Sequence, residues 1–294
     1  MRRRILLASV LSDVPDTPDI LDMPDYLTIE ALEDYLTVSL SVATCEYCVD
    51  GDGNWKPLIA GTATERINRG HTLSFRCNLT TNNSDGIGTF TVNKNFNLKG
   101  NCMSMLFGDN AAGNYSLNGK NDAFYRLFYK CTTLKSVSAN FLPATTLANR
   151  CYNSMFSGCT SLTTAPELPA TTLADSCYSA MFSSCYSLTT APELPATTLA
   201  HRCYNSMFSD CTSLTTAPEL PATTLANYCY NYMFHRCTKL NYIKMLATDI
   251  SATSCLVNWV YLVASSGTFV KNPEATWDVV GVNGVPEGWT VITE

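Results

Sequence analysis

The sequence predicts an α+β protein, in which a solenoid with one short strand and one short helix per turn follows a small β-sandwich-like domain. The first observation is a 26-residue repeat, whose copies begin at Cys151, Cys177 and Cys203 and share 20 of 26 positions. The second is a four-residue apolar spacing within each copy, and the third is a set of short alternating segments before the repeats. A unit this short cannot bury its own apolar face, so neighbouring units are expected to stack.

The first part of each unit has the apolar spacing of a helix. In the middle copy, Cys177, Met181 and Cys185 are spaced i, i+4, i+8, and Tyr178 and Phe182 form a second i, i+4 pair. Residues at this spacing share one face of an α-helix. The pattern therefore predicts a helix of about two turns in every unit.

The second part of each unit predicts a strand and a corner. Residues 187–191 are short and β-prone, and Pro192 ends them because proline lacks the N–H that a strand ladder needs. The residues expected to point inward are Leu188, Leu194, Leu199, Phe182 and Cys185. Their equivalents one period away should stack on them, with strands about 4.8 Å apart.

Atypical units flank the three copies, as the ends of a repeat array require. The predicted organisation has four parts: an extended or weakly signal-like leader (1–25), the β-sandwich-like domain (26–100), the repeats as a half-unit plus five units (101–254), and a β-hairpin cap (255–294). The leader has two interpretations. Three arginines before a short apolar stretch imitate the start of a secretory signal, but the apolar stretch is only seven residues long, which favours the alternative of a short extended leader that could serve as a docking peptide.

Residues 26–100 differ in pattern from the repeats. Apolar and polar residues alternate over 36–42, and residues 72–76 and 89–92 have similar character. This period of two is typical of half-buried strands. Several short strands separated by turn residues predict a β-sandwich-like domain.

Composition excludes several classes of function. The net charge is −6, and the only cluster of basic residues is Arg2–Arg4, which argues against binding to a nucleic-acid backbone. No apolar run approaches the eighteen or so residues of a membrane span. We therefore expect neither a nucleic-acid partner nor a membrane span.

The chemistry-bearing residues predict no enzyme, metal site or cofactor. Ten of the 14 cysteines recur at the same two positions of the repeat units. Such recurrence is typical of small residues buried in a shared core, and a free cysteine packs as one. Cys45 and Cys48 form a C-x-x-C, but no second pair follows at zinc spacing. No His-Glu-x-x-His or Gly-x-Ser-x-Gly occurs, and no one-off constellation interrupts the repeat.

One repeating aromatic position is the candidate for ligand binding. Tyr152, Tyr178, Tyr204 and Tyr230 recur at the second position of each unit. Stacked at the repeat spacing, they would form an aromatic ladder suited to sugar rings or to a protein. The alternative is that these rings merely cover the helix surface.

The repeats, with their M-F-x-x-C-x-x-L core and following proline corner, resemble the BspA-like leucine-rich repeats of bacterial surface proteins. The resemblance covers about residues 101–294, and residues 26–34 look like the β-module that precedes such repeats in some gut-bacterial and phage-associated proteins. It implies a non-enzymatic extracellular protein whose solenoid binds a protein or glycan on another surface. Because no clear export signal is present, the alternative is a phage virion fibre or decoration protein docked by its leader. The expected location is accordingly the bacterial cell surface or the virion.

Overall fold

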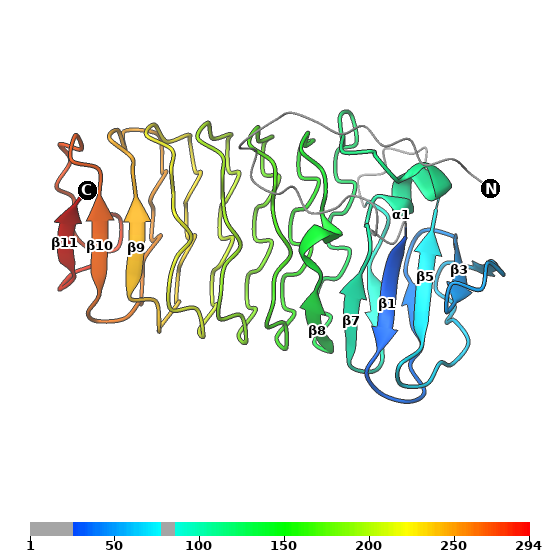
Figure 1. The fold of residues 1–294 in the computed structure, drawn as a ribbon. Coiled ribbons are helices and arrows are strands. Elements are labelled where there is room, and N and C mark those ends of the chain that lie inside the picture. Colours follow the sequence, from blue (N-terminus) through cyan, green and yellow to red (C-terminus); the bar gives the residue numbers. More distant parts are fainter. Residues whose placement is uncertain (1–25, 78–85) are drawn as a thin grey trace, which may run out of the picture.

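A computed structural model describes residues 26–77 and 86–294, which form an N-terminal module followed by a stack of coils (Figure 1). The strands are β1 (Leu27–Ala31), β2 (Val38–Leu40), β3 (Cys45–Val49), β4 (Lys56–Leu58), β5 (Thr72–Arg76), β6 (Phe90–Val92), β7 (Phe96–Lys99), β8 (Leu134–Val137), β9 (Tyr242–Met245), β10 (Thr268–Lys271) and β11 (Thr290–Thr293). The helical elements are α1 (Ser104–Phe107) and two 3-10 turns, η2 (Gly108–Asn110) and η3 (Ala139–Phe141).

The N-terminal module consists of two sheets. A six-stranded sheet has the order β4-β3-β5-β1-β7-β8, and β2 pairs with β6 in a separate two-stranded sheet. Phe75 on β5 and Phe90 on β6 are fully buried, and their ring centroids lie 5.2 Å apart. The two sheets therefore meet through apolar side chains. Strands β2, β5 and β6 lie within the segments for which the alternation of apolar and polar residues predicted strands.

The larger sheet continues from the module into the stack of coils. Strand β7 pairs antiparallel with β1 but parallel with β8, which belongs to the first coils. One continuous cluster of buried side chains runs from Leu27 to Trp289. The boundary predicted near residue 100 thus marks a change of strand direction within a shared core.

The predicted α+β class, with one helix in each turn of the repeats, is wrong: among the described residues the one α-helix is the four-residue α1, and the ordered elements are mostly strands. Over residues 176–185, backbone N–H groups donate alternately to two different kinds of acceptor. Met181 N donates to Tyr178 O, three residues earlier, at 3.2 Å, whereas Phe182 N donates to Met207 O on the next coil at 2.9 Å. An α-helix would instead bond each N–H four residues back. The repeats are therefore a ladder of tight turns bonded from coil to coil.

Left-handed backbone at every fourth residue explains this geometry. Ser176, Ala180 and Ser184 have φ of 54°, 52° and 60°, and Gly158 occupies the position equivalent to Ser184 in the preceding coil with φ of 78°. Each left-handed residue ends one tight turn and begins the next, so the backbone conformation repeats every four residues. Over eight residues a period of four cannot be separated from the helical 3.6, and for this reason the sequence predicted a helix.

In this ladder of turns, a glycine substitution is expected to change the stability of the protein in the opposite direction from the same substitution in an α-helix. Ala180→Gly is expected to stabilise the protein by about 1 kcal/mol, because an L-residue is strained in the left-handed region and glycine is not. In an α-helix the same change would cost about 1 kcal/mol. The midpoint of chemical denaturation, compared for wild type and Ala180→Gly, distinguishes the two, and a lower midpoint in the variant would contradict the ladder.

Two aromatic columns run through the core of the stack. Phe156, Phe182 and Phe208 stack at centroid separations of 5.8 Å, and the column continues to residues 128 and 234. Of the residues predicted to point inward, Leu188 and Leu194 are buried and Leu199 is half-buried against the core. This column makes each coil depend on its neighbours.

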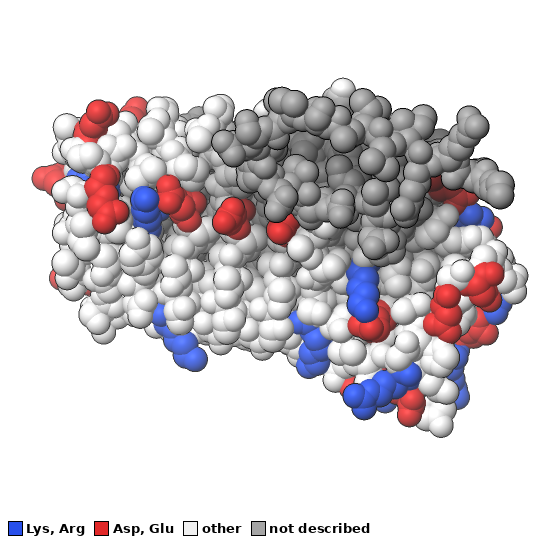
Figure 2. Space-filling model, in the orientation of Figure 1, with Lys and Arg blue, Asp and Glu red and all other residues white. Residues whose placement is uncertain are grey.

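The remaining part of each coil is extended, and its exposed threonines are interspersed with buried apolar residues. Parallel bridges join Thr164 to Thr190 and Thr172 to Thr198, one repeat apart. Side chains other than Lys, Arg, Asp and Glu cover much of the face of the stack shown in Figure 2, and acidic side chains follow one another along it. Glu219 and Lys244 form an ion pair.

The C-terminal segment extends the stack, and the predicted hairpin cap is wrong. Strand β10 pairs parallel with both β9 and β11, whereas a hairpin requires antiparallel strands. Two tryptophans fix this end: Trp259 Nε1 donates to Gly284 O at 2.9 Å, and Trp289 Nε1 donates to Ala264 O at 2.7 Å. Among the described residues, no helix has the length and apolar character needed to cross a membrane.

Candidate ligand-binding groove

The predicted tyrosine ladder exists, but it lies inside the protein. Tyr152, Tyr178, Tyr204 and Tyr230 stack with centroid separations of 5.8–6.2 Å, and each is at most 1% exposed. The tight turns direct these rings into the core, where they form the second aromatic column beside the phenylalanine column. The ladder of rings is as predicted, but a ligand on the surface does not reach it.

The repeat cysteines form two further buried columns. Cys185 Sγ donates to Phe156 O on the preceding coil at 3.2 Å, and Cys211 Sγ donates to Phe182 O at 3.1 Å. The thiol thus fills a small space in the core and also provides a bond between coils. Burial raises the pKa of the Cys211 thiol to about 12.

We expect these thiols to be unreactive in the folded protein. Burial favours the neutral thiol, and only the thiolate reacts readily. Labelling of Cys159, Cys185 and Cys211 at pH 8 should be slow in native protein and complete after denaturation, as mass spectrometry of labelled peptides would show. Rapid native labelling, or disulfide-linked peptides containing these cysteines, would contradict the burial.

The C-x-x-C segment belongs to a disulfide and not to a metal site. Cys45 on β3 is bonded to Cys77, directly after β5, with 4.8 Å between their Cα atoms, and Cys48 is a buried free thiol. Strands β3 and β5 are paired neighbours, so their register brings the two cysteines together. Among the described residues no group of His, Cys, Asp and Glu is arranged to hold a metal ion.

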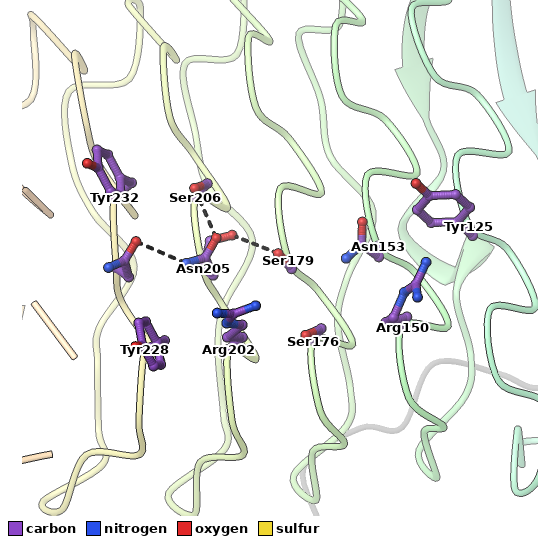
Figure 3. Close-up of a pocket in the computed structure, with 11 residues that line it drawn as sticks. Tyr125, Arg150, Asn153, Ser176, Ser179, Arg202, Asn205, Ser206, Tyr228 and Tyr232 are labelled. Atoms are coloured by element: carbon purple, nitrogen blue, oxygen red, sulfur yellow. Dashed lines mark hydrogen bonds between the residues drawn. The ribbon is translucent and has the colours of Figure 1, made fainter. Parts of the chain in front are cut away.

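A polar groove crosses the outer side of the turn ladder. We call this side the turn face; it consists of the outward-facing side chains of residues 122–130, 150–158, 176–184, 202–210 and 228–236. The groove has a volume of about 630 Å³, and Figure 3 shows its side chains arranged in rows across successive coils. Its lining residues are Tyr125, Arg150, Asn153, Ser176, Ser179, Arg202, Asn205, Ser206, Tyr228, Asn231 and Tyr232.

The middle coil forms the floor of the groove because its side chains are small. Ser176 and Ser179 stand where the neighbouring coils carry arginine and asparagine, as Figure 3 shows. Larger side chains rise on both sides, with Tyr125 toward the N-terminus and Tyr228 and Tyr232 toward the C-terminus. A change of side-chain size along a regular backbone thus hollows the turn face.

Hydrogen bonds hold the polar groups of the groove in place. Asn205 Nδ2 donates to Asn231 Oδ1 at 3.1 Å, and Ser206 Oγ donates to Asn205 Oδ1 at 3.1 Å. Ser179 Oγ donates to the backbone carbonyl oxygen of Asn205 at 3.3 Å. Side chains ordered in this way can offer donors and acceptors to a ligand with little further loss of conformational entropy.

The two arginines differ in their surroundings. Arg150 Nε pairs with Asp122 at 3.0 Å, and Arg202 lies 4.8 Å from the centroid of the Tyr228 ring. Both side chains are exposed. Among the described residues, no aspartate, glutamate, histidine or cysteine lines the groove, and the charged side chains of its lining are Arg150 and Arg202.

The groove residues occupy the positions at which the repeats vary. Ser179 replaces the asparagine of its sister copies, and Ser176 lies at the last position of the unit, which is serine, arginine or tyrosine in the three copies. The ligand-binding prediction followed the invariant tyrosines, which are invariant because the core needs the same ring in every coil. The positions that vary among otherwise identical repeats were therefore the sequence signal for the exposed groove.

Comparison of the chain with protein-family models, with curated proteins and with solved structures returned no match. The resemblance to BspA-like repeats therefore stays a prediction from the sequence.

Proposed function

We propose that this chain is a non-enzymatic recognition protein that binds a glycan along its turn face. The groove carries the proposal: it is open, polar, lined by ordered amide and hydroxyl groups, and extends over several coils. Amide, hydroxyl and guanidinium groups can donate to and accept from sugar hydroxyls, and tyrosine faces pack against sugar rings.

A glycan fits this lining better than a protein partner does. Stable protein interfaces have an apolar centre of buried aromatic and aliphatic anchors. The floor of this groove instead consists of Ser176 and Ser179, and asparagines stand beside it. A ligand with many hydroxyl groups matches such a floor, because it replaces the hydrogen bonds that these residues make with water.

An extracellular location is part of the proposal, at the bacterial surface or on a virion. The Cys45–Cys77 disulfide supports it, because such bonds persist in oxidising compartments. The buried repeat thiols agree with this, since oxidants and other thiols do not reach them. The leader, on which secretion and virion docking differ, lies outside the described residues.

The experiment is binding to an array of neutral and acidic oligosaccharides by the wild type and two tryptophan variants. Ser179→Trp places a large ring on the floor of the groove, and Thr189→Trp places the same ring on an exposed site outside it. We expect wild type and Thr189→Trp to bind the same glycans and Ser179→Trp to lose them. Equal binding by both variants, or none by the wild type, would refute the proposal.

A further inference from the structure

Two arginines of the groove lie in one row with a serine between them. Arg150, Ser176 and Arg202 each precede the first buried cysteine of a coil, and their φ values are 56°, 54° and 54°. They therefore occupy the same position on three successive coils, as Figure 3 shows. With about 4.8 Å between adjacent strands, the two arginines are about 10 Å apart along the stack.

Both arginines keep guanidinium N–H groups that can donate to a ligand, although the charge of Arg150 is shared with Asp122. The ion pair of Arg150 uses Nε, and its side chain is still 48% exposed. Among the residues that the structure describes, no carboxylate lies within ion-pair distance of Arg202, whose guanidinium packs near the Tyr228 ring. A ligand thus meets two cationic groups in the row.

The middle coil has the opposite character. Asp175, which is exposed, directly precedes Ser176, whereas the equivalent residues of the adjacent coils are Asn149 and His201. A negative group above the middle coil would meet no arginine, and it would have a like charge nearby, because Asp175 directly precedes Ser176 although it lies outside the groove lining. Favourable and unfavourable places for negative charge therefore alternate along the groove.

We propose that the groove binds an acidic glycan with a carboxylate or sulfate on every second sugar ring. This rests on the glycan-binding function proposed above and names the ligand class of the same groove. One ring of an extended glycan advances by about the height of one coil, so acid groups on alternate rings lie over Arg150 and Arg202. The ring between them lies over Ser176 and Ser179, where its hydroxyls meet serine and asparagine side chains.

The test uses octasaccharides of hyaluronan and of unsulfated chondroitin, which carry one carboxylate on alternate rings, with their carboxyl-reduced forms as controls. In titration calorimetry, at least one acidic octasaccharide should bind, and its reduced form should bind at least tenfold more weakly. Arg150→Gln and Arg202→Gln should each weaken binding of the acidic form about tenfold, and added salt should weaken it further. Binding of neither octasaccharide would overturn the inference.

A rearranged variant tests the spacing at constant charge. Arg202→Ser combined with Ser176→Arg keeps two arginines in the row but places them on adjacent coils, and it leaves Arg150 paired with Asp122. We expect this variant to bind as weakly as Arg202→Gln, and wild-type affinity would overturn the alternate-ring spacing.

The two proposals fail in different ways. If Ser179→Trp abolishes glycan binding while carboxyl reduction and both Arg→Gln variants change nothing, the groove binds glycans but the acidic ligand class is wrong. If Ser179→Trp has no effect on any glycan, the proposed function itself is wrong.

Discussion

Raising the pH from 8 to 10 is expected to unfold the stack of coils cooperatively. Ten buried thiols have pKa values raised by burial: Cys102, Cys131, Cys151, Cys159, Cys177, Cys185, Cys203, Cys211, Cys229 and Cys237. Burial raises the pKa of Cys131 and Cys211 to about 12, and it raises the pKa of the other buried thiols in the same direction. In the unfolded chain they ionise near pH 8.5.

The direction of the effect follows from proton linkage. Above pH 8.5 the unfolded chain binds fewer protons than the folded protein, so the free energy of unfolding falls as the pH rises toward 12. Below pH 8.5 the thiols are neutral in both states and the contribution is constant. At pH 10 each thiol lowers the free energy of unfolding by about 2 kcal/mol. A few thiols together therefore match the about 5–15 kcal/mol that stabilises a typical domain.

Urea denaturation followed by circular dichroism between pH 7 and pH 11 measures this loss. The dependence of the free energy of unfolding on pH should be close to zero below pH 8 and steep above pH 9. Cys211→Ala removes one titrating group, so its slope above pH 9 should be smaller by about one proton, or about 1.4 kcal/mol per pH unit. A flat profile up to pH 10.5 would show that the thiols are not desolvated.

The contrast between the buried columns and the groove shows what the sequence could predict. The 26-residue period placed the buried cysteines and two of the three leucine positions correctly, because a repeated core imposes the same residue on every coil. The local backbone was mispredicted because turns with a left-handed residue at every fourth position have almost the apolar spacing of a helix. Non-glycine residues such as Ala180 and Ser184 occupy those positions, so no glycine pattern revealed them.

The groove could not be predicted because it is a property of neighbouring coils and not of one unit. Ser176 and Ser179 are small, unremarkable residues in the sequence, and they form a floor only because Arg150 and Arg202 stand on the coils beside them. That adjacency depends on which side of the coil faces water. The helix prediction gave the wrong orientation and placed the tyrosines outside.

Phe182→Ala is expected to lower the free energy of unfolding by about 3–5 kcal/mol, the range for removing a fully buried aromatic ring. Its ring lies between Phe156 and Phe208, at 5.8 Å from each. Since the coils are rigidly bonded to one another, the space cannot collapse around the alanine, and both neighbouring rings lose a contact.

The matched control is Tyr186→Ala, which removes an aromatic ring of similar size from the same coil. Tyr186 is 47% exposed, so its loss should change the free energy of unfolding by no more than about 0.5 kcal/mol. Hydrogen exchange adds a local measurement: in Phe182→Ala, the amides of Phe156 and Phe182, which bond to the next coil, should exchange faster. If the two alanine variants were equally stable, the phenylalanine column would not be what holds adjacent coils together.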